Sequence, residues 1–331
     1  MEEKLYPVSS RRLRLNAQIR SLVSPLRLNH QSFILPLFVD EGLSVPRFVQ
    51  NMGGVQVETK ETIFLAIENA LKAGITKFLL FPVPAHKKMV PDDFSFAENI
   101  VNSIKNKFSN DIWLAADVCL CSYTRHGHCG LLDSTSTYVD NDTSVALLTQ
   151  YALKLAQSGV DCVAPSDMMD GRIKSIRNVL NHHGMDQTTL MSYSTKFNSS
   201  LYGPFRDACH SAPASDTLKD RKSYQLSSIH ALQAIQTSMS DEQDGADILM
   251  VKPSSMYMDI IYRIKQTTRL PLAAYHVSGE YAMIESLAAL GGIDRQKAHL
   301  ELWISLHRAG ADIIISYAAI HAKEWISTFE Y

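Results

Sequence analysis

The chain has 331 residues, of which 46% are hydrophobic and 20% are charged, a balance typical of a globular protein with a large core. Its 32 basic and 34 acidic residues give a net charge of −2, which argues against nucleic acid or an anionic membrane as a partner. No apolar stretch approaches the ~18–20 residues that cross a bilayer, and the first residues lack an apolar signal core. We therefore expect a cytoplasmic protein with no membrane or nucleic-acid partner.

Residues 1–30 precede the first predicted strand and include three arginines between positions 11 and 15. They could form a solvated tail. The alternative, which we adopt, is an N-terminal arm that makes oligomer contacts with a neighbouring subunit. Residues 31–331 are then expected to form one catalytic barrel.

Short, almost continuously apolar runs alternate along the chain with segments of helical apolar spacing. Such runs are typical of strands buried on both faces of a parallel sheet. Helical spacing is clearest in 61–73, 144–158 and 297–309, and a glycine follows each segment. This alternation predicts an α/β fold, a single (β/α)8 TIM barrel; the alternative, an open doubly wound sheet, lacks a GxGxxG or Walker A motif in support. The predicted strands are 33–39, 77–83, 112–119, 161–166, 189–194, 246–252, 270–278 and 311–317.

Polar side chains gather at the carboxyl ends of these predicted strands, where enzymes of this fold carry their active sites. A purely structural barrel would have no reason to collect them there. The residues concerned are Asp117, Cys119, Ser166, Asp167, Ser194, Lys196, Lys252, His276, Ser278, Ser316 and Tyr317.

Lys252 ends the sixth predicted strand and Lys196 follows the end of the fifth by two residues; these strands should be neighbours about 4.8 Å apart. Burial and like charge in an apolar barrel mouth both lower the pKa of a lysine. A neutral lysine can attack a ketone or aldehyde to form a Schiff base. The alternative is a pair of lysines that reach solvent or form salt bridges. Because two lysines stand at adjacent strand ends, we favour Schiff-base chemistry.

Cys119, Cys121 and Cys129 are three of only five cysteines, and they lie within eleven residues. The odd total makes a disulfide framework unlikely in a cytoplasmic protein. Thiolates this close in sequence can bind one zinc ion, and three protein ligands leave the open position of a catalytic site. The alternative is a set of buried or redox-active cysteines. His126 and His128 share the loop and could bind the metal, orient a ligand or face the substrate.

The segment 197–225 is the longest one without clear periodicity, which is typical of an active-site lid. It carries four cations, Arg206, Lys219, Arg221 and Lys222. Because arginine binds a carboxylate through two parallel hydrogen bonds, a cationic lid over a Schiff-base site implies a keto acid substrate. A solvated charged loop is the alternative on composition alone.

Seven motifs that span most of the chain are DVCLCSYTRHGHCG (117–130), VAPSDMMDGRI (163–173), MSYSTKF (191–197), YGPFRDA (202–208), DRKSYQ (220–225), MVKP (250–253) and YHVSGEYAM (275–283). In this order they resemble the porphobilinogen synthase family, also called delta-aminolevulinic acid dehydratase. The family condenses two molecules of 5-aminolevulinate to porphobilinogen, with loss of two waters, on the route to tetrapyrroles and heme. Its fold is a (β/α)8 barrel with an N-terminal arm, assembled commonly into homooctamers.

The resemblance implies a role for each matching residue. The first substrate would form its Schiff base with Lys252 and the second with Lys196. A catalytic zinc ion would bind the three clustered cysteines. The other matching residues are Ser278 and Tyr317 for the first carboxylate, Arg206, Arg221 and Gln225 for the second, and Asp117 and Ser166 for proton transfer.

Two further metal sites known among relatives lack support in this sequence. Ser223 stands where some relatives have a cysteine for a second zinc, bound together with the histidine that matches His128. Thr237 lies, in an approximate register, where some bacterial relatives have an acidic residue for allosteric Mg2+. Magnesium-type relatives have aspartates in place of the three cysteines, so this chain resembles the zinc-type members. A class I aldolase and a non-catalytic zinc-binding barrel remain the alternatives; neither requires two lysines at strand ends.

Overall fold

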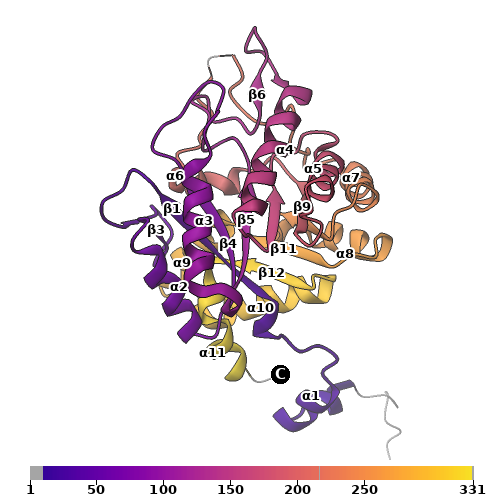
Figure 1. Ribbon diagram of the computed structural model, residues 1–331. Helices are drawn as coiled ribbons and strands as arrows, with labels where there is room; N and C mark the ends of the chain where they lie inside the picture. Colours follow the sequence, from indigo (N-terminus) through magenta and orange to yellow (C-terminus); the bar gives the residue numbers. More distant parts are fainter. Residues whose placement is uncertain (1–9, 216, 330–331) are drawn as a thin grey trace, which may run out of the picture.

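The computed structural model describes residues 10–215 and 217–329, and its centre is a closed barrel of parallel strands (Figure 1). The strands follow one another around the barrel in chain order, and the last pairs with the first to close it. This confirms the predicted (β/α)8 barrel and excludes the open sheet. The barrel strands are β1 (Phe33–Asp40), β4 (Lys77–Val83), β5 (Trp113–Val118), β8 (Cys162–Pro165), β9 (Thr189–Lys196), β10 (Ile248–Lys252), β11 (Leu272–His276) and β12 (Ile313–Ser316).

Helices surround the barrel on its outer side (Figure 1). The three predicted helical segments correspond to α2, α4 and α10. The helices of this layer are α2 (Ile63–Lys72), α3 (Ser95–Phe108), α4 (Asn141–Gln157), α5 (Arg172–His182), α7 (Ala231–Gln243), α8 (Met258–Thr267), α9 (Ser278–Ala289), α10 (Arg295–Ala309) and α11 (Ala322–Ser327).

Local sequence signals explain where these elements begin and end. The carboxylate of Asp140 caps α4 by accepting a hydrogen bond from the amide of Thr143 at 3.0 Å. Gly310 ends α10 in a left-handed conformation with φ of 118°. A Cβ atom at Gly310 would also lie 2.8 Å from the Cβ of Lys265, so a larger residue would collide with α8.

Short elements extend the loops at both ends of the barrel. β3 pairs in parallel with β1, and β2 pairs antiparallel with β3, while β6 and β7 form a separate hairpin. The predicted lid is less irregular than expected, because it contains a helix, α6. The short elements are β2 (Arg47–Phe48), β3 (Gln56–Glu58), β6 (Leu131–Leu132), β7 (Val139–Asp140), α6 (Gly203–Ala208), and the 3-10 turns η3 (Ser109–Asp111), η4 (Ser200–Tyr202), η5 (Ser255–Tyr257) and η6 (Tyr317–His321).

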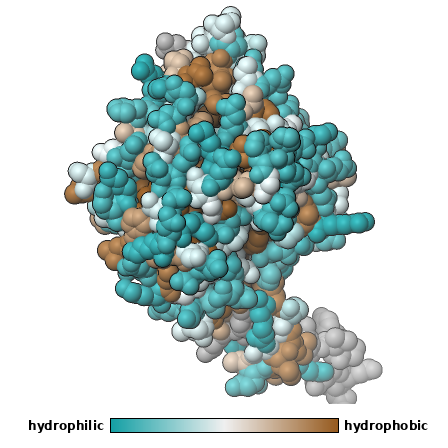
Figure 2. All heavy atoms as spheres, in the orientation of Figure 1, coloured by the Kyte–Doolittle hydropathy of each residue, from teal (hydrophilic) through white to brown (hydrophobic). Residues whose placement is uncertain are grey.

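The segment before the barrel holds η1 (Ser10–Arg14), α1 (Ala17–Val23) and η2 (His30–Ser32). In Figure 1, α1 lies apart from the barrel, and none of its residues is buried. Leu15 and Leu22 are 71% and 78% exposed, and Figure 2 shows apolar atoms on this part of the surface. The oligomer contacts of the arm stay a prediction, and residues 1–9 of the arm lie outside the described residues. None of the described helices has the length and apolar character required to cross a membrane.

Candidate active site

The carboxyl ends of β9 and β10 bring Lys196 and Lys252 together. The two lysines are register partners across the parallel pair, as their places at adjacent strand ends predict. Both side chains are buried. Their Nζ atoms lie 5.6 Å and 5.0 Å from the centroid of the same ring, that of Tyr193, so both amines lie in one part of the barrel mouth.

Lys252 sits in an aromatic enclosure. Its Nζ lies 4.1 Å from the ring centroid of Tyr275, 4.8 Å from that of Phe205 and 5.5 Å from that of Tyr202. Burial lowers the pKa of Lys252 to about 7, and the charge of Lys196 acts in the same direction. A large fraction of the Lys252 amine is therefore neutral, and nucleophilic, at neutral pH.

Asp117 and Ser166 adjoin the two lysines. The ammonium group of Lys196 donates a hydrogen bond to the backbone carbonyl of Ser166. Burial raises the pKa of Asp117 to about 6, although the charges of Lys196 and Lys252 and the hydroxyl of Ser166 oppose the shift. Oδ1 of Asp117 has no hydrogen-bond partner among the described residues. A carboxyl group with this pKa can accept and return a proton near neutral pH.

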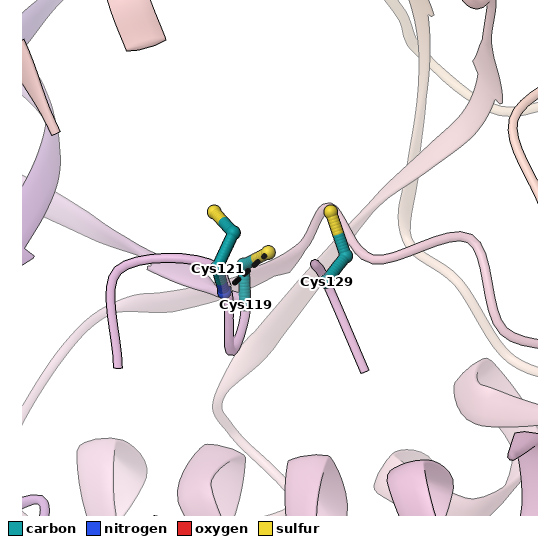
Figure 3. Close-up of side chains that lie close together, drawn as sticks. All are labelled: Cys119, Cys121 and Cys129. Carbon is teal, nitrogen blue, oxygen red and sulfur yellow. Dashed lines mark hydrogen bonds between the residues drawn. The ribbon is translucent and has the colours of Figure 1, made fainter. Parts of the chain in front are cut away.

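Cys119, Cys121 and Cys129 form a compact buried cluster on the loop that follows β5. Their sulfur atoms all lie within 4.8 Å of one another, and Figure 3 shows the three side chains side by side. The backbone amide of Cys121 donates a hydrogen bond to Sγ of Cys119 at 3.5 Å. Hydrogen bonds from Cys119 and Cys121 lower the pKa of Cys129 well below its usual range, with a contribution from Arg221.

This cluster fits a zinc ion in both size and chemistry. Zinc with Zn–S bonds of ~2.3 Å in a tetrahedral arrangement holds its sulfur ligands roughly 3.8 Å apart. The observed spacing needs little adjustment to reach that value. A donor set made only of thiols favours zinc over magnesium, which prefers oxygen ligands.

The lid, residues 197–225, packs against the cysteine loop, residues 119–130. The amide of Ala214 donates to the carbonyl of His126 at 3.0 Å. The guanidinium of Arg221 donates to the carbonyl of Gly127 at 2.9 Å. Gly127 has φ of 69°, and a Cβ atom there would lie 2.3 Å from the carbonyl oxygen of Ala212. Only glycine therefore allows the two segments to approach this closely.

The two histidines of the cysteine loop differ: both ring nitrogens of His128 have hydrogen-bond partners, whereas Nε2 of His126 is buried without one among the described residues. His128 contacts the lid through both ring nitrogens, with Nδ1 3.0 Å from the hydroxyl of Tyr224 and Nε2 2.9 Å from the carbonyl of Leu218. Nδ1 of His126 accepts a hydrogen bond from the amide of His128, and burial lowers the pKa of His126 to about 4. These contacts give His128 a role that was not predicted from the sequence: it holds the lid, and neither ring nitrogen is directed to the thiols.

Four lid residues present buried polar atoms without partners among the described residues. These atoms are Nε of Arg206, Oγ of Ser211, Nε of Arg221 and both side-chain heteroatoms of Gln225. Buried polar groups are normally paired, so their convergence indicates a site for a polar ligand. Lys219 and Lys222, the other lid cations, are exposed to solvent and lie outside this group.

Ser278 and Tyr317 lie at the ends of β11 and β12, close to Lys252. The hydroxyl of Tyr317 is 3.2 Å from that of Tyr275, whose ring packs against Lys252. The hydroxyl of Ser278 accepts a hydrogen bond from the amide of Phe205 at 3.1 Å and donates to the carbonyl of Leu201 at 3.3 Å. A carboxylate at Ser278 would share or replace these bonds to the lid.

The aromatic residues around the amines were not predicted from the sequence. Tyr193, Tyr202 and Tyr275 lie inside the motifs that carry the lysines, the lid arginine and Ser278, and this proximity is the signal that could have found them. Phe205 directly precedes Arg206 in the motif YGPFRDA and carries the same signal, although only the folded lid brings its ring to 4.8 Å from Nζ of Lys252.

Comparisons with known proteins point to one family. The family model described as "Delta-aminolevulinic acid dehydratase" matches residues 8–325. The delta-aminolevulinic acid dehydratase of Helicobacter pylori is 44% identical over 319 residues, which cover 95% of this chain and 96% of the relative. The delta-aminolevulinic acid dehydratase of Bacillus subtilis is 39% identical over 321 residues, which cover 96% of this chain and 97% of the relative.

A solved structure is similar over the whole barrel. The crystal structure of the Toxoplasma gondii ME49 delta-aminolevulinic acid dehydratase, in complex with its reaction product porphobilinogen, has a TM-score of 0.91 and 37% identity. The similarity covers 97% of this chain and 92% of that one. Because the family model and the relatives each match nearly the whole chain, this protein belongs to the delta-aminolevulinic acid dehydratase family.

Proposed function

We propose that this chain joins two molecules of 5-aminolevulinate to form porphobilinogen, releasing two waters, through Schiff bases on two lysines. The observation that carries the proposal is the placement of Lys196 and Lys252 as buried register partners in one barrel mouth. A class I aldolase needs one such lysine, and a non-catalytic zinc-binding barrel needs none. The membership of the family supports the same conclusion.

Lys252 would bind the first substrate. Its neutral amine attacks the ketone carbon, and loss of one water leaves the imine. The hydroxyls of Ser278 and Tyr317 would bind the carboxylate of this substrate, since both lie at strand ends beside the amine. The surrounding rings exclude water, which protects the imine from hydrolysis.

Lys196 would bind the second substrate in the same way. Arg206, Arg221 and Gln225 would hold its carboxylate, because they supply buried polar atoms that are otherwise unpaired. Arginine suits this role because its planar fork matches a carboxylate. The different carboxylate sites then decide which molecule takes which part in the condensation.

We also propose that the protein is of the zinc type, with Cys119, Cys121 and Cys129 as the ligands. Bound zinc supplies a Lewis acid that can polarise a substrate carbonyl or activate a water molecule. Neither a second zinc site at Ser223 nor an allosteric magnesium site at Thr237 is part of the proposal. Ser223 is exposed, and the hydroxyl of Thr237 donates within α7 to Gln233.

The condensation requires one substrate to become a carbon nucleophile. A protonated imine withdraws electrons and makes the adjacent C–H bond more acidic. Asp117, with its raised pKa and its unpaired buried oxygen, would accept this proton. The hydroxyl of Ser166 would help to orient the Asp117 carboxyl group. The closed lid holds the two substrates together, so their reaction becomes effectively intramolecular.

We further propose that the chain works as a homo-oligomer, an octamer as is common in its family, in the cytoplasm. The exposed apolar residues Leu15 and Leu22 on the N-terminal arm support a subunit contact, because an isolated arm would leave them in water. A neighbouring copy of the chain would bury them.

The experiment that tests the proposed function is a direct assay of the product. The purified, zinc-loaded protein is incubated with 5-aminolevulinate, and porphobilinogen is measured by its colour reaction. We expect one porphobilinogen for every two substrate molecules consumed. Absence of product from folded, metal-loaded protein would refute the assignment.

Replacing Arg206 with methionine is expected to raise the KM for 5-aminolevulinate by about 10- to 100-fold, the effect of losing a charged hydrogen bond worth ~1.5–3 kcal/mol. Methionine keeps the packing of the aliphatic stem. Lys222→Met is the matched control, since Lys222 is a lid cation exposed to solvent. Equal KM values for both variants would exclude Arg206 from the carboxylate site.

The reactivity of Lys252 is expected to rise with pH through about 7 and to level off above it. The amine reacts only when neutral, and its pKa is about 7 because of burial and the neighbouring Lys196. Acetylation of Lys252 by acetic anhydride, quantified by mass spectrometry between pH 5 and 10, measures this profile. Added Nα-acetyl-lysine serves as the reference amine, with a pKa of ~10.4. A Lys252 profile that follows the reference would contradict the prediction.

A further inference from the structure

Glu280, in the first turn of α9, is a buried carboxylate that none of the roles above uses. Its Oε1 accepts hydrogen bonds from the amides of Ser254 and Ser255, at 3.0 Å and 2.6 Å, and from the hydroxyl of Ser255 at 2.5 Å. Its Oε2 accepts from the amide of Val277 at 2.8 Å and from the hydroxyl of Ser254 at 3.3 Å. One carboxylate therefore binds donors from two separate loops.

These two loops carry the residues proposed to bind the first substrate. Ser254 and Ser255 follow Lys252 by two and three residues, directly after β10 ends. Val277 immediately precedes Ser278 and follows the last residue of β11. Glu280 thus joins the segment that follows the Schiff-base lysine to the segment that presents the carboxylate-binding serine.

Helix capping alone does not explain this arrangement. A glutamate in the first turn of a helix commonly bonds back to the backbone amide at the N-cap, as Glu280 does to Val277. The three bonds from Ser254 and Ser255 to Oε1 lie outside that motif and reach across to another strand. Burial raises the pKa of Glu280, and its hydrogen bonds oppose that shift. A buried carboxylate is costly, so its donors must be well placed to retain it.

The side chain of Ser254 strengthens this link beyond what the backbone amides provide. In this chain the hydroxyl of Ser254 gives Glu280 an additional hydrogen bond.

We propose that Glu280 is a positioning residue that fixes the distance between the amine of Lys252 and the hydroxyl of Ser278. The proposal rests on the function proposed above, since it concerns the geometry in which the first substrate forms its imine. Glu280 does not touch the reacting atoms; it acts through the two loops that it joins. A displacement of about 1 Å between an amine and a carboxylate site can cost ~10²-fold in rate.

The variant that tests this role is Glu280→Gln. A glutamine has the same size but only one acceptor oxygen, so its amide group must face either the Ser254 and Ser255 amides or the Val277 amide. We expect kcat to fall by about 10- to 100-fold with a smaller change in KM. We also expect borohydride reduction in the presence of 5-aminolevulinate to modify Lys252 less, relative to Lys196, than in the wild type.

Glu285→Gln is the matched control. Glu285 is on the same helix and is largely buried, but its partners are Arg295 and His299, away from the lysines. We expect this variant to lower the melting temperature and leave kcat and the labelling ratio within about 2-fold of wild type. If Glu280→Gln does not fold, Ser255→Ala, which removes one bond to Oε1, should show the same changes to a smaller extent.

A wild-type labelling ratio and kcat in Glu280→Gln, or in Ser255→Ala if that variant is used, would overturn the positioning role. Losses of kcat and of Lys252 labelling no larger than those of Glu285→Gln would also overturn the positioning role. A wild-type protein that makes no porphobilinogen refutes the proposed reaction instead, so the two failures can be told apart.

Discussion

Replacing Lys252 with methionine is expected to lower the rate of porphobilinogen formation by at least about 10³-fold and to leave the barrel folded. The activity falls because no other group can form the first imine at that position. The fold survives because methionine is apolar and fits among the rings of Tyr275, Phe205 and Tyr202. The product assay measures the first effect, and circular dichroism with thermal melting measures the second.

Lys77→Met is the matched control for this prediction. Lys77 begins β4, at the opposite end of the barrel from Lys196 and Lys252, and burial lowers its pKa as well. Its replacement therefore tests the loss of a partly buried lysine without touching the site. We expect activity within about 2-fold of wild type. Residual activity above about a tenth of wild type in Lys252→Met would contradict the Schiff-base role.

Removing the metal with a chelator is expected to lower the rate of porphobilinogen formation by at least about 10³-fold and to leave the barrel folded. The three cysteines lie on a loop beyond the end of β5, whereas the strands and helices form a separate apolar core. The lid should become more sensitive to protease, because it is hydrogen-bonded to the cysteine loop through Arg221 and His128. Added zinc should restore both activity and protease resistance.

Cysteine substitutions separate loss of the metal from general damage. Cys129→Ser should reproduce the chelated state, with zinc absent by elemental analysis. Cys162→Ser replaces an equally buried cysteine within β8, outside the cluster. It should keep its zinc and most of its activity. Full activity in wild-type protein that elemental analysis shows to be free of zinc would contradict a catalytic role for the metal.

The barrel could be predicted because each strand is buried on both faces. The runs at 33–39 and 77–83 are almost wholly apolar, and they became β1 and β4 with nearly the expected bounds. Strand order then follows from the closure of a parallel barrel, which is why the pairing of Lys196 with Lys252 was predictable.

Contacts between loops could not be predicted, because they depend on side chains that meet only after the barrel has formed. The lid appeared irregular, yet it contains α6, a helix too short to show periodicity. His128 appeared equally suited to metal and to substrate until its two nitrogens were seen bound to Tyr224 and Leu218. Glu280 lies in the motif YHVSGEYAM, but its bonds to Ser254 and Ser255 could not be predicted, since those residues come from a different strand end.

The central claim is that both lysines form imines with the substrate, and chemical trapping tests it most directly. The zinc-loaded protein is mixed with 5-aminolevulinate, reduced with borohydride and digested, and the modified peptides are identified by mass spectrometry. We expect substrate-derived adducts on both Lys196 and Lys252, and on no other lysine. Adducts on only one of them, or on neither, would contradict it.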